Sequence, residues 1–264
     1  MSRRLLIAGN WKMHGSYEMT ADVISGVARR ALDQASLSEQ RELAYDILIC
    51  PPAVYLQAAL VAADSQPISI GAQNVNANET GAFTGELSIP MLSEVGCEYV
   101  LLGHSERREL FGETDADVAA KFSACVEKGS LVPILCVGES LVERQAQATE
   151  AVVAKQIDVV LDQVGIAGLA NSVIAYEPVW AIGTGETASP EQAQVVHQFI
   201  RNKLDALDSD IASAIRIIYG GSMKAHNALD LLRQKDIDGG LVGGASLDVG
   251  SFSAICEAAK KTLT

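Results

Sequence analysis

The stretch Val-Ile-Ala-Tyr-Glu-Pro-Val-Trp-Ala-Ile-Gly-Thr-Gly, residues 173–185, joins a β-branched apolar run to a carboxylate and then to a long loop. A short apolar run of this kind is typical of a buried strand. Ser189, Pro190 and Gln192 follow as an N-cap, a first helical residue and the partner that completes a capping box. The stretch therefore predicts a strand-loop-helix unit whose strand ends in a polar side chain.

The same order recurs along the chain. Helical spacing of apolar and charged residues predicts helices over 17–33, 115–128, 143–164, 191–207 and 252–260. Short apolar runs predict eight strands, at 5–10, 46–50, 68–73, 99–104, 132–137, 172–177, 216–219 and 240–242. Alternation of strands and helices indicates a parallel sheet.

The ends of the strands distinguish a closed barrel from an open sheet. Polar and glycine residues cluster at the C-terminal ends of at least five predicted strands. A barrel brings all such ends to one site, whereas an open doubly wound sheet brings together only those at its switch point. The sequence therefore predicts an α/β fold, a (β/α)₈ barrel. Since the 264 residues contain no break in composition, we expect one domain over residues 1–264.

Charge and composition exclude several kinds of partner. The formal net charge of -13 disfavours nucleic acid and anionic membrane surfaces, which both attract clustered Lys and Arg. Any phosphate site must therefore be built locally. Neither a secretory signal nor a membrane-spanning run is evident, so we expect a soluble cytoplasmic protein.

The five cysteines are widely spaced, without a C-x-x-C pair, and the four histidines form no ligand pattern. We expect reduced packing thiols, with neither a disulfide framework nor a structural metal.

Two strand ends carry candidate catalytic groups. Asn10 and Lys12 alternate onto one face of the first strand, although a solvated lysine at the rim would give the same pattern. The fourth strand leads into His104 and Glu106. The structural alternative is that Glu106 pairs with a nearby cation while His104 satisfies a backbone group.

Glu177 ends the sixth strand and is followed by apolar residues that could cover it. Desolvation would raise its pKa towards the range useful to a general base, whereas the structural alternative is a rim glutamate paired with an arginine. Residues 183–188 match the dinucleotide pattern G-x-G-x-x-A, but residues 178–182 separate them from the strand. We therefore interpret residues 178–188 as a hinged lid.

Two glycine-rich turns follow the last two strands, at residues 220–222 and 243–246. Glycines let backbone N–H groups approach an anion closely, and barrels often hold phosphate at these two loops. The pair of turns favours a phosphate site over plain turns.

Together these segments resemble the triosephosphate isomerase family in order and spacing. The resemblance covers nearly the whole chain. It rests on residues 10–12, 103–108, 136–139, 175–185, 219–222 and 243–247, with further similarity at 73–75 and 81–86.

The resemblance implies a TIM barrel that interconverts dihydroxyacetone phosphate and glyceraldehyde 3-phosphate through an enediolate, in glycolysis and gluconeogenesis. By position, Glu177 would be the base, His104 the electrophile, Lys12 and Asn10 the donors to substrate, and Glu106 a supporting partner. The family's phosphate donors correspond to Gly183, Ser222, Gly243 and Gly244. Neither a metal nor an organic cofactor is implied.

The resemblance also implies a moving lid and a homodimer. The lid residues would be Pro178, Val179, Trp180, Ala181, Ile182, Gly183 and Thr184, supported by Tyr219 and Glu139. The long segment 74–88 would dock into a partner subunit, and the implied interface residues are Met13, Gln73, Asn74, Phe83, Thr84, Gly85 and Glu86. His14 departs from the asparagine of many relatives, which puts the interface hydrogen bonding in doubt.

Two other functions fit parts of the sequence. One is another phosphate-binding barrel enzyme, such as a sugar-phosphate epimerase or a lyase, which would share the glycine turns but would not need the other segments together. The other is a non-catalytic sugar-phosphate binder, which should have lost the base, the lysine or the lid.

Overall fold

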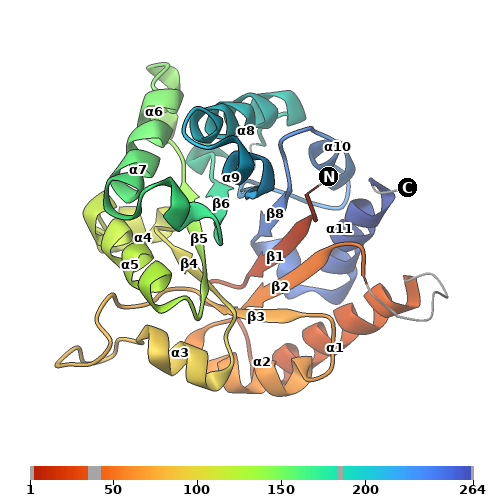
Figure 1. The fold of residues 1–264 in the computed structure, drawn as a ribbon. Helices are drawn as coiled ribbons and strands as arrows, with labels where there is room; N and C mark the ends of the chain where they lie inside the picture. The colour runs from red at the N-terminus through yellow and green to blue at the C-terminus, as the bar shows by residue number, and fades with distance from the viewer. Residues whose placement is uncertain (1–2, 35–42, 183–186, 263–264) are drawn as a thin grey trace.

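Eight parallel strands form a closed barrel in the computed structural model, which describes residues 3–34, 43–182 and 187–262 (Figure 1). Each strand pairs with the next, and β8 pairs with β1 to complete the ring. The strands are β1 Leu6–Asn10, β2 Asp46–Cys50, β3 Ser69–Ala72, β4 Tyr99–Leu102, β5 Val132–Val137, β6 Val173–Tyr176, β7 Arg216–Tyr219 and β8 Gly239–Val242. The prediction of a single (β/α)₈ barrel is confirmed.

Hydrophobic runs located the strands well and their ends less well. Strands β2, β5 and β7 have the predicted bounds, and the other five differ from them by one or two residues at an end. The fourth strand ends at Leu102 and not at His104, because the chain turns at Gly103, whose φ is 72°. His104 is thereby released from the strand and becomes the N-cap of a helix.

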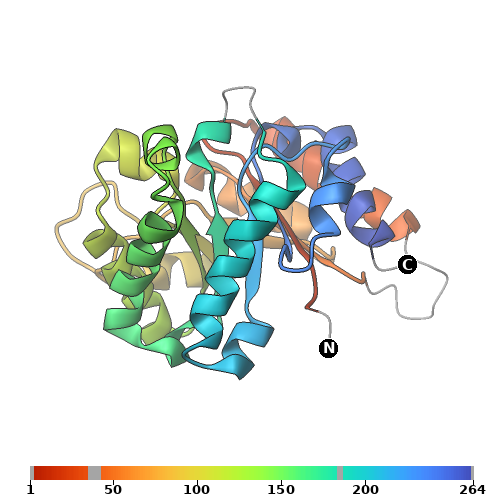
Figure 2. The same ribbon diagram turned by 90° about the horizontal axis from the view of Figure 1, so that it is seen from above.

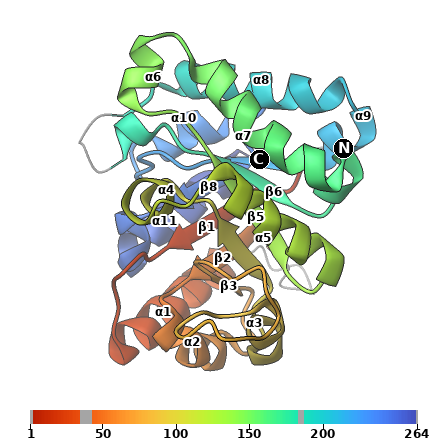
Figure 3. The ribbon, with the colours of Figure 1, turned by 90° about the vertical axis from the view of Figure 1, so that its left-hand side faces the viewer.

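The helices cover the outside of the barrel (Figures 1 and 2). In Figure 3, α5 and α7 lie side by side. The helices are α1 Tyr17–Gln34, α2 Leu56–Ala63, α3 Ile89–Val95, α4 Ser105–Phe111, α5 Asp115–Lys128, α6 Leu141–Gln145, α7 Thr149–Val164, α8 Pro190–Asp205, α9 Ser209–Ala214, α10 Ala228–Leu232 and α11 Val249–Lys261. Short 3₁₀ turns are η1 Ala53–Tyr55, η2 Ile166–Leu169, η3 Val179–Ala181 and η4 Gly244–Leu247.

One predicted helix is wrong and one predicted helix start is confirmed. The helix expected over 143–164 is divided into α6 and α7, because a capping box at Ser140 starts α6 early and Gln147, with φ 57°, interrupts the helical path. The capping box of Ser189 and Gln192 does begin α8, with Pro190 in its first turn. Among the described residues, no helix is both long and apolar enough to cross a membrane.

Alternation along the strands creates two apolar layers. One fills the barrel interior and includes Leu6, Ala8, Leu48 and Leu101, whereas Ile7, Ile47 and their equivalents face the helices. All five cysteines are free and buried, as expected of packing residues.

The long segment between β3 and α3 projects beyond the helix layer (Figure 1). It is tied at its base by the N–H of Asn76, which donates to the carbonyl oxygen of Leu87 at 2.8 Å. The Asn76 side chain donates to Glu86 Oε2 at 3.2 Å. Phe83 is 44% exposed on this projection, although it is a large apolar side chain.

A buried ionic cluster closes the N-terminal end of the barrel. Arg201, on α8, lies 2.8 Å from Asp236 and 2.5 Å from Asp238, and it also donates to two backbone carbonyls. Asp238 in turn accepts the N–H of Ile217 in β7 at 2.8 Å. The cluster therefore joins a helix of the outer layer to a strand of the barrel.

We expect Arg201→Met to lower the free energy of unfolding by about 3 kcal/mol, the low end of the range for breaking a buried ion pair. The two carboxylates of the cluster lose their Arg201 contacts but keep Arg3 as a cationic partner. Urea unfolding followed by circular dichroism measures the change. The matched control is Lys155→Met. Lys155 is 76% exposed and 3.9 Å from Asp115, so its loss should cost less than about 0.5 kcal/mol. Equal losses in the two variants would contradict the importance of the cluster.

His197 is fully buried on the inner face of α8. Its ring lies edge-on to Tyr176, with centroids 5.7 Å apart, and 6.4 Å from the ring of Tyr219. Its Nδ1 donates to the carbonyl oxygen of Asp236 at 3.2 Å. Burial, which opposes the charged ring, lowers the pKa of His197 from 6.5 to about 4.

This pKa predicts a loss of stability in mild acid. Below pH 6.5 the unfolded chain binds a proton at His197 that the folded chain accepts only near pH 4, so stability is lost as pH falls through that window. The histidine should account for about 2 kcal/mol between pH 7 and pH 5. Urea unfolding at both pH values, for wild type and His197→Gln, measures the difference. An unchanged pH dependence in the variant would show that His197 is not responsible.

Candidate active site

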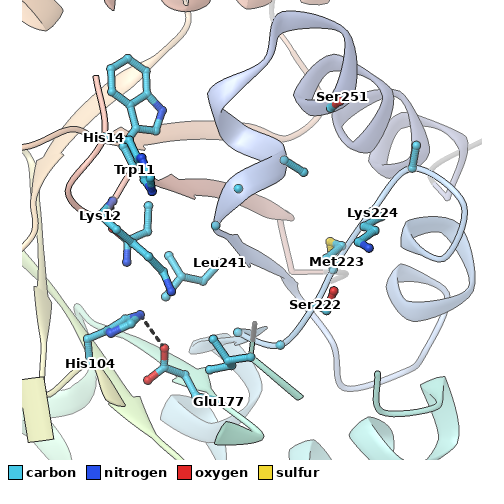
Figure 4. Close-up of a pocket in the computed structure, with 18 of the residues that line it drawn as sticks. Trp11, Lys12, His14, His104, Glu177, Ser222, Met223, Lys224, Leu241 and Ser251 are labelled. Carbon is cyan, nitrogen blue, oxygen red and sulfur yellow. Dashed lines mark hydrogen bonds and ion pairs between the residues drawn. The ribbon is translucent and has the colours of Figure 1, made fainter. Parts of the chain in front are cut away.

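A cavity of about 690 Å³ opens at the C-terminal ends of the strands (Figure 4). The barrel brings polar groups from five strand ends to its wall. The predicted site residues that line it are Asn10, Lys12, His104, Glu177, Ser222, Gly243, Gly244 and, from the lid, Ile182. Gly183, Thr184 and the rest of 183–186 lie outside the described residues. Glu106 lines an adjoining cavity of about 310 Å³, which also reaches Asn10, Lys12 and His104.

Glu177 is held by two neighbours from the β4 end. Its Oε2 accepts the backbone N–H of Ser105 at 2.9 Å, and its Oε1 lies 3.0 Å from His104 Nε2. The carboxyl group is only 2% exposed. The backbone is fixed as well, because a Cβ at Gly138 would lie 1.7 Å from the Glu177 carbonyl oxygen, so β5 and β6 approach this closely only with glycine there.

The predicted rise of the Glu177 pKa is wrong for this arrangement. Burial does act to raise it, but the attraction and hydrogen bond of His104, the Ser105 N–H and the charge of Lys12 together outweigh burial. The pKa of Glu177 therefore lies below its usual value. These opposing contacts come from other strands, which the sequence pattern around Glu177 does not reveal.

His104 is oriented by the start of α4. As N-cap residue, it accepts the backbone N–H of Glu106 at Nδ1, at 3.2 Å. Nδ1 is therefore the acceptor, and Nε2 carries the proton that faces Glu177 and the cavity. Burial acts to lower the pKa of His104, but the Glu177 carboxylate raises it overall. The Glu106 N–H, by contrast, favours the neutral ring.

Lys12 reaches the cavity by a turn and not by strand alternation. Strand β1 ends at Asn10, so the expectation that Asn10 and Lys12 share a strand face is wrong. Lys12 has φ 53°, a left-handed backbone that costs a side-chain-bearing residue roughly 1–2 kcal/mol. Its N–H donates to Asn10 Oδ1 at 3.0 Å, and its Nζ lies 2.5 Å from Glu106 Oε1. Asn10 and Lys12 are thus brought together by a local hydrogen bond.

The two glycine turns complete the wall of the cavity, and the turn at Ser222 is visible in Figure 4. Gly244 begins the short turn η4, and Lys12 Cε lies near Gly243. Asn227, which the sequence analysis missed, fixes the turn at Ser222. Its side chain donates to the Ser222 carbonyl at 3.0 Å and accepts the Lys224 N–H at 2.8 Å. An asparagine shortly after a Gly-Gly-Ser turn is a signal that could have identified it.

Within the described part of the predicted lid, residues 178–182, Trp180 is hydrogen-bonded to a buried carboxylate. Glu139 Oε1 accepts Trp180 Nε1 at 3.0 Å, Tyr176 OH at 3.1 Å and Arg144 Nη1 at 3.1 Å. The Arg144 guanidinium also lies 4.5 Å from the centre of the Trp180 ring. Tyr219 contacts the neighbouring loop, since a Cβ at Gly221 would lie 2.2 Å from its hydroxyl.

Five of the seven predicted interface residues lie around the smaller cavity beside Lys12. Met13, Gln73, Asn74, Gly85 and Glu86 line it. Met13 is 94% exposed, and Thr84 is exposed on the projecting segment beside Phe83. Among the described residues, no group of three or more His, Cys, Asp or Glu could hold a metal ion.

Comparison with known proteins gives one consistent result. A sequence profile described as triosephosphate isomerase matches residues 5–259. A relative from Alcanivorax borkumensis is 53% identical over 263 residues, covering 98% of this chain and 100% of the relative. Relatives from Halorhodospira halophila and Rhodopirellula baltica are 54% and 52% identical, covering 97% and 98% of this chain and 98% and 99% of themselves.

All three relatives are named triosephosphate isomerase. The profile and the relatives both extend over nearly the full length, from the first strand to the last helix. The chain belongs to the triosephosphate isomerase family.

Proposed function

We propose that this chain interconverts dihydroxyacetone phosphate and D-glyceraldehyde 3-phosphate by proton transfer through an enediolate. The observation that carries the proposal is the convergence of Glu177, His104 and Lys12 on a cavity that two glycine turns also line. A carboxylate, a neutral N–H donor and an ammonium group are the three functions that the reaction requires.

Glu177 is the base. Its carboxylate takes a proton from the carbon beside the carbonyl, and the C–H electron pair forms the enediolate double bond while negative charge develops on oxygen. The hydroxyl proton on the first carbon moves to the former carbonyl oxygen, which leaves a new carbonyl group on the first carbon. Glu177 then returns its proton to the adjacent carbon, which completes the isomerisation. When substrate binds, it takes over the contact between His104 and Glu177. Glu177 then loses a contact that lowers its pKa, so its carboxylate becomes a stronger base.

His104 and Lys12 stabilise the developing charge. The proton on His104 Nε2 is directed into the cavity because the Glu106 N–H occupies Nδ1. Lys12 Nζ adds positive charge, and Asn10 is free to donate its amide hydrogens to substrate because its oxygen already accepts the Lys12 N–H. Glu106 holds the ammonium group until substrate binds. Stabilisation by groups fixed in advance is usually the largest contribution to catalysis.

The phosphate group would bind to N–H groups of Ser222, Gly243, Gly244 and, from the lid, Gly183. The lid of Pro178, Val179, Trp180, Ala181, Ile182, Gly183 and Thr184 would close over it. Exclusion of water protects an enediolate phosphate that would otherwise expel its phosphate. Glu139 holds Trp180 in the present arrangement, and Tyr219 would support the closed one.

The active form would be a homodimer in the cytoplasm. The exposed apolar side chain of Met13 on the smaller cavity and that of Phe83 on the projecting segment support an interface there. A partner's projecting segment, with Thr84 at its exposed face, would fill that cavity and complete the surroundings of Lys12. The five unpaired, buried thiols fit a reducing compartment.

Glu177→Gln should lower kcat for triose-phosphate interconversion by about 10²–10⁴-fold, because the amide cannot accept the proton. A coupled spectrophotometric assay in both directions measures the rate. Glu94→Gln is the matched control, since Glu94 is exposed on α3. A wild-type chain without turnover would refute the proposed function, and a variant that keeps most of the rate would refute the role of Glu177.

Lys12→Met should weaken the binding of 2-phosphoglycolate about ten- to a hundredfold, the range expected for loss of a charge-assisted hydrogen bond. Isothermal titration calorimetry measures the dissociation constant. Lys224→Met makes the same change at an exposed lysine on the wall of the same cavity and should alter binding less than about threefold. Unchanged affinity in Lys12→Met would show that Lys12 is a solvated lysine at the rim of the barrel with no part in ligand binding.

A further inference from the structure

The backbone of Lys12 is strained. Its φ of 53° lies in the left-handed region, where the usual occupant is glycine. The side chain leaves the backbone in a direction set by that conformation, so Nζ reaches Glu106 and the cavity only while it persists. Strained residues persist only where their surroundings hold them.

One side chain from outside the β1 loop is hydrogen-bonded to the backbone of Lys12. Gln73, directly after β3, donates from Nε2 to the carbonyl oxygen of Lys12 at 2.8 Å and to that of Cys50 at 2.9 Å. Both hydrogens of its amide nitrogen are thereby used. Cys50 ends β2, and its carbonyl also accepts the N–H of Trp11 at 3.1 Å. The ends of three consecutive strands are therefore joined at one amide group.

We propose that Gln73 is a positioning residue for the reaction, which holds the Lys12 carbonyl so that the Lys12 ammonium group points into the active site. The inference rests on the proposed function, because it concerns the placement of Lys12 for the same chemistry. Asn10 holds the N–H side of Lys12 and Gln73 holds the carbonyl side. Without Gln73 the peptide that follows Lys12 is free to turn, and φ relaxes towards negative values that carry Nζ away from the cavity.

Gln73→Met tests this directly, because methionine has a similar length and no N–H donors. We expect kcat/KM for triose-phosphate interconversion to fall about ten- to a hundredfold, with both a raised KM and a lowered kcat, since Lys12 acts on bound substrate and on the developing charge. Gln73→Glu, which has the same shape and also lacks the two donors, should lose a similar amount. It provides a second variant if the first does not fold.

The control is Gln194→Met, the same change at another partly buried amide. Gln194 donates to Asp236 Oδ2 at 2.6 Å and accepts the Asp236 N–H at 3.0 Å, in the ionic cluster at the other end of the barrel. This variant should lose stability while keeping kcat/KM within about twofold of wild type. Equal kinetic losses in both variants would overturn the proposal, because they would reflect general destabilisation.

A double-mutant cycle distinguishes positioning from a structural role. In the wild-type background Gln73→Met should raise the dissociation constant of 2-phosphoglycolate about tenfold, whereas in the Lys12→Met background it should raise it less than twofold. The same loss in both backgrounds would overturn the proposal. So would wild-type kcat/KM in Gln73→Met, or a loss that disappears at protein concentrations where sedimentation shows a restored dimer.

The cycle measures binding, so it also separates the two proposals. Absence of triose-phosphate turnover in the wild type would refute the proposed function. Coupling between Gln73 and Lys12 in phosphoglycolate binding would still show that Gln73 positions Lys12.

Discussion

Closure of the barrel between β8 and β1 is the constraint on which the site depends. At this joint the backbones approach so closely that a Cβ at Gly239 would lie 1.9 Å from the carbonyl oxygen of Leu6, and Gly239 itself has φ 143°. Only glycine tolerates both conditions. Closure then sets the glycine turn after β8 beside the Lys12 turn after β1, although these segments are at opposite ends of the chain. An open sheet of the same strands would separate the charge of Lys12 from the glycine turn after β8.

Two glutamates at neighbouring strand ends show how the barrel gives one residue type two roles. Glu139 accepts three hydrogen bonds on one oxygen, and with them it holds Trp180 in the present arrangement. Glu177 has a backbone N–H from Ser105 and one contact to His104, which in the proposed reaction also donates to substrate. In that reaction, substrate takes over the His104 contact and so changes the surroundings of Glu177 directly, whereas Glu139 would lose Trp180 on lid closure and keep its other two hydrogen bonds. The difference lies in the partners and not in the carboxyl group.

The sequence predicted what depends on local patterns. Apolar runs located all eight strands, and Ser189 with Gln192 located the start of α8, because capping and burial leave marks within a few residues. It predicted the direction of the Glu177 pKa wrongly, since that direction depends on contacts from the β4 end. It also placed Lys12 on the strand, because no local sequence pattern predicts a lysine with a left-handed backbone conformation. The break between α6 and α7 at Gln147 was missed for the same reason.

The turn at Lys12 explains why the wrong predictions about Lys12 and Glu177 concern the candidate site and not the core. Core residues obey the strand period, so their neighbours along the chain predict their orientation. A functional side chain at the rim must point towards the cavity. Alternation along the strand does not in general give it that direction. Lys12 departs from it through a strained backbone, which is held from two sides by Asn10 and Gln73. The strain is offset partly by the local bond to Asn10 and partly by the bond from Gln73, which exists only once β1, β2 and β3 have paired. The position of the lysine is therefore a property of the assembled rim, which no window of sequence around residue 12 contains.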